Sequence, residues 1–231
     1  MKPWTLLDWL FPPRCALCGA FLWGKEKTAR LCPACAGRER LKEGWKMGKL
    51  PFVAGSVCVY PYEGEVRRGV HRFKFRGAAQ NGEIFGVLLA SRVRETGLSE
   101  QIDLVCYVPC HPKVKRKRGY EQAQKLAKPL ARELGLPLEP LLEKRRNTRP
   151  MYQLNAAQRR ANGLGAFGVV PGKEALVRSR RVLVVDDVLT TGSTLSECAR
   201  VLREAGAREV YGAVFARTFA KRPGDKTGKR V

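Results

Sequence analysis

Apolar residues along the chain alternate between short continuous runs and segments with helical spacing. Two runs, Ile102–Val108 and Val182–Val185, are apolar on both faces, which is typical of strands buried in a parallel sheet. Val53–Tyr60 and Val210–Phe215 are further strand-like runs. Because helical segments separate these runs, the pattern predicts βαβ units and an α/β fold with a parallel sheet flanked by helices.

Helical spacing is clearest at Val66–Phe75, Ile84–Val93 and Ala123–Leu134. Gly135 follows the third segment and predicts its end, since glycine accepts the left-handed conformation common after a helix. Pro129 lies inside the same segment and predicts a kink or an early break.

The most specific stretch is Arg181–Leu195, with the sequence RVLVVDDVLTTGSTL. An aliphatic strand leads to two adjacent carboxylates, then to a loop of small hydroxyl residues, then to a helix that ends near Gly206. This helix is expected to begin near Thr194, because Thr194 and Glu197 have capping-box spacing. The order of these features predicts a mononucleotide-type half-site at the carboxyl end of a parallel strand.

A helix N-terminus offers unpaired N–H groups and a partial positive charge, which suit a phosphate. The loop adds hydroxyl donors and a glycine that permits close approach; its residues are Thr190, Thr191, Gly192, Ser193 and Thr194. Carboxylates do not bind phosphate, so Asp186 and Asp187 need another partner. Either a ribose diol or a hydrated magnesium ion fits them. The stretch therefore predicts a sugar phosphate ligand.

VLVVDDVLTTGSTL resembles the phosphoribosyl pyrophosphate motif of the type I phosphoribosyltransferases. The resemblance implies that Asp186 and Asp187 hold the ribose hydroxyls and act as the catalytic acids of any transferase reaction. It implies that the loop from Thr190 to Thr194 holds the 5′-phosphate, and that the ligand is bound with Mg²⁺. A phosphoribosyltransferase-like domain is accordingly expected over residues 51–218.

Four of the eight cysteines are patterned as two knuckles, Cys15-x-x-Cys18 and Cys32-x-x-Cys35. Two knuckles can place four thiolates on one structural zinc ion, with a small β-hairpin between them, as in zinc ribbons. Disulfides are the alternative, although nothing in the sequence points to an oxidising compartment. Residues 1–50 are therefore expected to form a small module that needs metal to fold. The other four cysteines are expected to be core thiols: Cys58, Cys106, Cys110 and Cys198.

The first residues, MKPWTLLDWLF, are interpreted as a short amphipathic helix that covers the protein's own core, with a membrane face or a partner protein as the alternatives. A signal peptide is rejected, because Asp8 interrupts the apolar run and no small-residue cleavage site follows. No apolar run approaches the ~18 residues of a membrane span. A cytoplasmic protein is expected, with peripheral attachment to the inner membrane left open.

Charge is the other strong feature, because the formal net charge is +23. Basic residues cluster at Lys113–Arg118, Lys144–Arg149 and Arg178–Arg181, and again in residues 219–231, a tail expected to be disordered. Such a surface favours polyphosphates, nucleic acid or anionic lipid, although a merely solvated basic face is the alternative. P-loop NTPases are excluded, since no Gly-Lys-Ser/Thr sequence occurs.

The two knuckles ahead of this motif, with the stretch VPCHPKVKRKRGYEQAQKLA, resemble the ComF family of competence proteins. That resemblance implies a zinc-finger-like module joined to a phosphoribosyltransferase domain, linked to uptake of transforming DNA. The loop and pyrophosphate candidates are Pro109, Cys110, His111, Arg118, Gly119, Arg146 and Arg159. The chain departs from the family pattern at Glu121, where asparagine is usual, and at Met151, where glutamine is frequent.

Two functions from different classes remain open. In the first, the chain is a ComF-like protein that binds phosphoribosyl pyrophosphate, or a related ribose phosphate, and handles single-stranded DNA during uptake. Its partners would include a DNA-translocating helicase or the membrane uptake machinery. In the second, the chain is an active phosphoribosyltransferase with an unknown nucleobase or amine acceptor. Transfer at the anomeric carbon needs positioning and a stabilised leaving group rather than a nucleophile, so the sequence does not decide whether turnover occurs.

Overall fold

The computed structural model describes residues 12–24, 26–41, 50–146 and 165–219. A four-stranded, fully parallel sheet forms the centre of the molecule, with the strand order β1-β6-β5-β2. Its strands are β1 (Gly55–Pro61), β2 (Leu104–Tyr107), β5 (Arg181–Leu189) and β6 (Glu209–Arg217). The parallel sheet predicted from the hydrophobic pattern is therefore confirmed.

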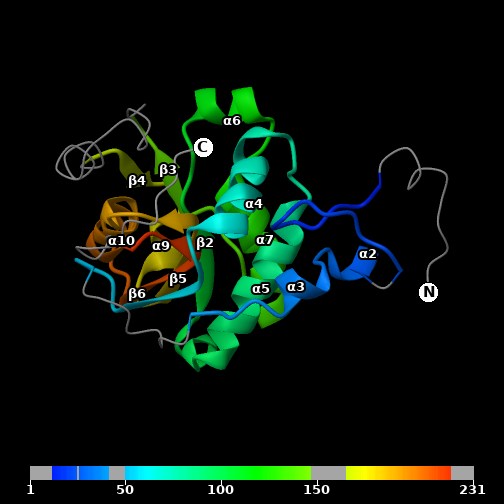
Figure 1. Cartoon of the computed structure of the whole chain (residues 1–231). Helices are drawn as coiled ribbons and strands as arrows, with labels where there is room; N and C mark the ends of the chain where they lie inside the picture. Colours follow the sequence, from blue (N-terminus) through cyan, green and yellow to red (C-terminus); the bar gives the residue numbers. More distant parts are fainter. Residues whose placement is uncertain (1–11, 25, 42–49, 147–164, 220–231) are drawn as a thin grey trace, which may run out of the picture.

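Helices cover both faces of this sheet. On one face lie α5 (Asn81–Glu95) and α7 (Gln122–Leu134), which contact each other and the strands, with α4 (Gly64–Phe75) beside them. On the other face lies α10 (Ser193–Glu204), against β5 and β6. Figure 1 shows the strands between these layers, so the apolar residues of the central strands are buried on both sides.

Pro129 does not break α7. The helix runs unbroken from Gln122 to Leu134 and ends, as expected, at Gly135, which has a φ of 68°. The early break offered as one outcome is therefore wrong. Pro129 lies at the interface with α5, where a Cβ on Gly86 would come within 2.3 Å of its ring. Tight packing between α5 and α7 holds the proline inside the helix.

A second, two-stranded sheet lies apart from the first and was not predicted. It is antiparallel and pairs β3 (Leu142–Lys144) with β4 (Phe167–Val169). Short elements complete the domain: η1 (Leu98–Gln101), α6 (Pro112–Arg118) and α9 (Glu174–Val177). Because β3 ends at Lys144, this small sheet brings a basic cluster to the edge of the domain.

The two cysteine knuckles lie on the helical layer, at the side of the molecule away from α10 (Figure 1). In place of the hairpin expected between the knuckles, the described residues there form the single turn α2 (Glu26–Ala29). One antiparallel bridge, between Arg14 and Phe21, encloses the first knuckle, and the single turn α3 (Pro33–Ala36) lies at the second. Leu17 and Leu22 are fully buried and belong to the same hydrophobic core as the domain. The proposed amphipathic helix at the start of the chain lies outside the described residues.

Candidate functional site

The acidic pair lies inside β5 rather than beyond its end. β6 keeps pairing with β5 as far as Leu189, so Asp186 still stands opposite Val214 in the sheet. Asp187 is only 8% exposed and Asp186 is half-buried. The sequence placed the two acids after the aliphatic strand, but strand pairing continues past the aliphatic run, so both carboxylates are at least partly buried.

Lys74, near the end of α4, contacts this acidic pair. Its Nζ lies 2.7 Å from Asp187 Oδ1, and the backbone N–H of Asp187 donates to Asp186 Oδ1 over 2.8 Å. Burial acts to lower the pKa of Lys74, but the charge of Asp187 outweighs it and the pKa is raised. Lys74 went unnoticed in the sequence, because nothing near it in the chain marks a partner on a distant strand.

A second lysine, Lys144 at the end of β3, also acts on the pair. Burial, and then the charge of Asp187, raise the pKa of Asp186 to about 7, while Lys74 and Lys144 act in the opposite direction. Burial lowers the pKa of Lys144 itself, and its ammonium lies 5.2 Å from the centre of the Phe167 ring. Lys74 thus contacts the acidic pair directly, whereas Lys144 acts on Asp186 through its charge.

The hydroxyl loop turns directly from β5 into α10. Gly192 has a φ of 80° and precedes the first helical residue, Ser193, without any side-chain cap. The hydroxyls of Thr191 and Ser193 lie 2.8 Å apart and hydrogen-bond to each other. The Ser193 N–H donates to Thr191 Oγ1 over 3.4 Å, so the loop gathers hydroxyls and N–H groups at the start of a twelve-residue helix, as a phosphate site requires.

The capping box predicted for Thr194 and Glu197 is wrong. Glu197 is buried, accepts a hydrogen bond from the backbone N–H of Gly165 over 2.6 Å, and pairs with Arg200 at 2.7 Å. Its carboxylate is thus engaged by the segment before β4. The positive φ of Gly192 starts the helix one residue earlier instead.

The loop after β2 is fixed by Glu121. One oxygen of this carboxylate accepts the backbone N–H of Cys110 over 2.8 Å, and the other lies 3.6 Å from Lys115 Nζ. His111 caps α6 by accepting the N–H of Lys113, and Gly119 ends that helix with a φ of 79°. Burial raises the pKa of Cys110 to about 11, so this thiol is not poised as a nucleophile.

The arginines predicted to bind pyrophosphate do not all lie at the loop after β2. Arg118 donates to Gln122 over 2.7 Å, and its guanidinium lies over the ring of Phe75, the residue that follows Lys74 in α4. Arg146 donates to the Gly165 carbonyl, beyond the end of β3. Arg159 and Met151 lie outside the described residues. The structure therefore places Arg118 against α4 and α7, and Arg146 beside Gly165, whose N–H Glu197 holds.

The four patterned cysteines converge on one point. Their sulfur atoms all lie within 4.8 Å of one another, and those of Cys18 and Cys32 are 3.7 Å apart, far beyond a disulfide bond. Burial acts to raise the pKa of Cys15, but backbone donors led by the N–H of Cys32 lower it to about 7. Four convergent thiols, one with stabilised thiolate, fit a tetrahedral zinc ion.

Two domain families are matched along the sequence, a double zinc ribbon domain over residues 6–44 and a phosphoribosyl transferase domain over residues 121–230. Competence protein F of Haemophilus influenzae is 31% identical over 202 residues, which cover 86% of this chain and 82% of that protein. DNA utilization protein YhgH of Salmonella typhi is 31% identical over 213 residues, covering 89% of this chain and 90% of its own. The chain belongs to this ComF/YhgH family.

The family, the parallel sheet and the cysteine cluster together confirm the predicted fold, a type I phosphoribosyltransferase domain with an N-terminal four-cysteine zinc ribbon module. Among solved structures, glutamine phosphoribosylpyrophosphate amidotransferase from B. subtilis is 27% identical over 59% of this chain, with a TM-score of 0.39. The chain spans about a quarter of that structure's length, since 26% of it is covered.

The basic surface of this family member is divided between two edges of the domain. Most of the α6 cluster is exposed, including Lys115, Arg116 and Lys117. Arg181 belongs to the other edge, where it pairs with Asp103 at 2.7 Å. Tyr120 is engaged within the domain: its ring packs on Phe73 and its hydroxyl donates to the Phe73 carbonyl. Residues 220–231 of the basic tail lie outside the described residues.

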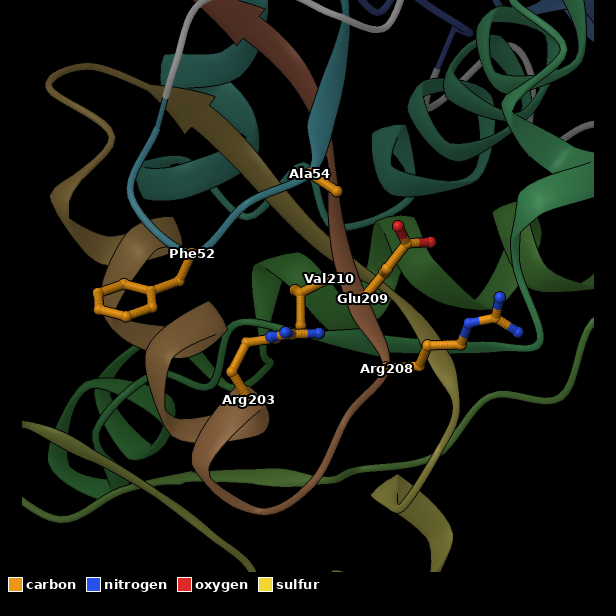
Figure 2. Close-up of a pocket in the computed structure, with 6 residues that line it drawn as sticks. All are labelled: Phe52, Ala54, Arg203, Arg208, Glu209 and Val210. Atoms are coloured by element: carbon orange, nitrogen blue, oxygen red, sulfur yellow. The ribbon is translucent and has the colours of Figure 1, made fainter.

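A depression at the opposite edge of the sheet is lined by Phe52, Ala54, Arg203, Arg208, Glu209 and Val210 (Figure 2). It lies where β1 and β6 begin, whereas ligands of open parallel sheets bind at the carboxyl ends of the strands. The depression is therefore separate from the acidic site of the ComF/YhgH chain.

No helix in the described part of the chain is long and apolar enough to cross a bilayer.

Proposed function

We propose that the chain binds phosphoribosyl pyrophosphate, or a related ribose phosphate, with Mg²⁺ at the carboxyl end of β5. The observation that carries this proposal is the joining of an acidic pair in β5 to a hydroxyl loop that opens α10. The loop from Thr190 to Thr194 would hold the 5′-phosphate. The free oxygens of Asp186 and Asp187 would accept the ribose hydroxyls, with Mg²⁺ supplying charge to the pyrophosphate.

The loop after β2 is suited to the pyrophosphate itself. Glu121 fixes the backbone around Cys110, so Pro109, Cys110 and His111 present a rigid turn beside the basic helix α6. Arg118 ends that helix and lies over the Phe75 ring of α4, and Gly119 follows as its C-cap. The resemblance described above implies asparagine where this chain has Glu121, and either side chain can hold the turn by accepting a hydrogen bond.

The cellular role we propose is in the uptake and handling of DNA. Competence protein F and DNA utilization protein YhgH carry this role in their names, and both align over most of the chain. The exposed lysines and arginines of α6 would contact the phosphates of a single strand at the cytoplasmic face of the inner membrane. A DNA-translocating helicase or the membrane uptake machinery would pass the strand to this protein.

An active phosphoribosyltransferase remains the second candidate, favoured by the domain match over residues 121–230. Such an enzyme would release pyrophosphate when a nucleobase or amine attacks the anomeric carbon, and the acidic pair would orient the ribose. Pyrophosphate release measured with a panel of bases and amines separates the two candidates, because a binding protein releases none.

Ligand binding is tested by Asp186→Asn combined with Asp187→Asn, measured by calorimetry with phosphoribosyl pyrophosphate and Mg²⁺. Loss of binding is expected, because a neutral amide pair is a weaker acceptor for ribose hydroxyls. Asp103→Asn serves as the matched control, since Asp103 lies at the other edge of the sheet. If the double variant binds as tightly as the unaltered chain, the acids have been assigned wrongly.

DNA binding is tested by filter binding of single strands across a range of salt concentrations. Changing Lys115, Arg116 and Lys117 together to alanine should flatten the dependence of affinity on salt, because fewer counterions are released. Zinc content should stay unchanged. The DNA role is overturned by the absence of single-strand affinity at low salt. Competition by phosphoribosyl pyrophosphate would indicate that the strand and the ligand share one site.

A further inference from the structure

Helix α4 contacts both candidate sites of the chain. Lys74, in its last turn, forms the ion pair with Asp187. Two residues earlier, Arg72 donates to the carbonyl of Leu17 over 2.7 Å and to that of Ala16 over 3.3 Å. Ala16 and Leu17 are the two residues between Cys15 and Cys18, so a short stretch of one helix joins a cysteine knuckle to the acidic pair.

The contact between α4 and the knuckle is close and involves backbone atoms. A Cβ on Gly69 would lie 2.6 Å from the Ala16 oxygen, so only glycine permits this approach. Asn81 of α5 donates to the same oxygen over 3.4 Å. Because Cys15 and Cys18 would hold one metal ion, the carbonyls between them are fixed in place whenever that metal is bound.

The rest of α4 leaves little freedom to shift. Glu65, at its start, pairs with Arg38 at 2.5 Å, just after the second knuckle. Phe73 is fully buried, packs edge-on against Phe85, and accepts the Tyr120 hydroxyl through its carbonyl. Because close-packed interiors transmit strain, a displacement of α4 where it contacts the knuckle is passed along the helix to Lys74 in its last turn.

We propose that Lys74 is a positioning residue for the acidic pair, and that the four-cysteine module sets its position through α4. The inference rests on the proposed function, because the pair is taken to hold ribose hydroxyls. Lys74 engages Oδ1 of Asp187 and would thereby fix the orientation of the carboxylate for the ligand. Arg72 and Gly69 hold the helix in the register that makes this contact.

The first test is calorimetry of the full-length, zinc-loaded chain with phosphoribosyl pyrophosphate and Mg²⁺. Lys74→Met should weaken binding on the order of tenfold, the size expected for one lost charge-assisted hydrogen bond. Lys74→Arg should restore most of the affinity, because it keeps the charge. Arg72→Ala should weaken binding by about threefold to tenfold if the same contact is displaced.

The matched control is Arg67→Ala, an exposed arginine on the same helix, which should leave the affinity unchanged. Combining Lys74→Met with Arg72→Ala should weaken binding no further than Lys74→Met alone, since both act through one contact. Arg72→Lys, which keeps the charge but loses the two-carbonyl contact, replaces Arg72→Ala if that variant loses zinc or does not fold.

A ligand-free measurement separates this inference from the proposed function. In nitrogen-15 NMR spectra, Lys74→Met and Arg72→Ala should both shift the backbone amide signals of Asp187 and Val188, whereas Arg67→Ala should not. If the unaltered chain binds no ribose phosphate, the proposed function fails, and these signals still decide whether the module sets Lys74. Unchanged signals with Arg72→Ala, or additive losses of affinity in the double variant, would overturn the coupling. Wild-type affinity in Lys74→Met would overturn the role of Lys74.

Discussion

Replacing Asp186 with asparagine should stabilise the protein at neutral and alkaline pH while it removes ligand binding. Burial raises the pKa of Asp186 to about 7, from an ordinary value of 3.8. The folded state therefore favours the protonated carboxyl and loses stability as pH rises from the unfolded value through the folded one. Asparagine has nearly the same shape and carries no charge at any pH.

The size of the effect follows from the pKa difference. A shift of about three units corresponds to about 4 kcal/mol, and this cost is fully present only above pH 7. Relaxation and water entry reduce it, so about 2 kcal/mol is a reasonable gain for Asp186→Asn at pH 8. Near pH 4 the gain should vanish, because the carboxyl is then neutral in the folded state. For a chain of this size, the pH 8 gain raises the unfolding midpoint by about 4–8 °C.

The assay is thermal unfolding of both chains at a series of pH values between 4 and 8. The Arg181 guanidinium holds the pKa of Asp103 below its usual range, so Asp103→Asn should instead destabilise the protein at neutral pH. The two variants change the same residue type at opposite edges of one sheet. A difference between Asp186→Asn and the unaltered chain that is the same at pH 4 and pH 8 would refute the reasoning from burial.

Three further predictions concern the metal, the helix interface and the ligand. Purified chain should carry one zinc ion, and Cys32→Ser should lose it and destabilise the module, as metal analysis and thermal unfolding will show. Gly69→Ala should destabilise the protein by about 1–3 kcal/mol in denaturant unfolding, because its Cβ would clash with the Ala16 oxygen. Affinity for phosphoribosyl pyrophosphate should increase between pH 6 and pH 8 in calorimetry, because Asp186 gains its charge over that range. An affinity that falls over that range would exclude the ionised carboxylate as the acceptor.

Local sequence was sufficient wherever the chemistry and its scaffold are contiguous. The aliphatic run, the two acids, the hydroxyl loop and the helix follow one another without a gap, so the strand-to-helix turn at Gly192 could be predicted as a unit. The same holds within each cysteine knuckle, whose spacing places two thiols side by side. Short-range spacing determines these sites because a few residues of backbone fix the relative positions of the side chains.

Contacts between distant segments could not be predicted in this way. Lys74 reaches Asp187 across the helical layer, and no residue near Lys74 distinguishes it from the other lysines of the chain. Glu197 had the spacing of a cap, yet a long-range hydrogen bond to Gly165 outcompeted that local role. The extension of β5 past Val185 likewise depends on β6, which supplies the pairing partner. In each case tertiary packing overrode a reasonable local preference.

The small size of the four-cysteine module indicated that a metal ion is its main source of stability. The structure shows a second source, which is the packing of the module against the domain. Leu17 and Leu22 are fully buried, and a module of this length has too little apolar surface of its own to cover them. Both belong to the hydrophobic core of the domain, and Arg72 of α4 and Asn81 of α5 satisfy the carbonyls of the knuckle. The domain therefore holds the thiols close together before any metal binds, which reduces the ordering entropy that binding must overcome. These contacts also act on α4, because a metal-bound knuckle gives that helix a fixed surface to pack against. The last turn of α4 carries Lys74, which pairs with Asp187 of the acidic pair.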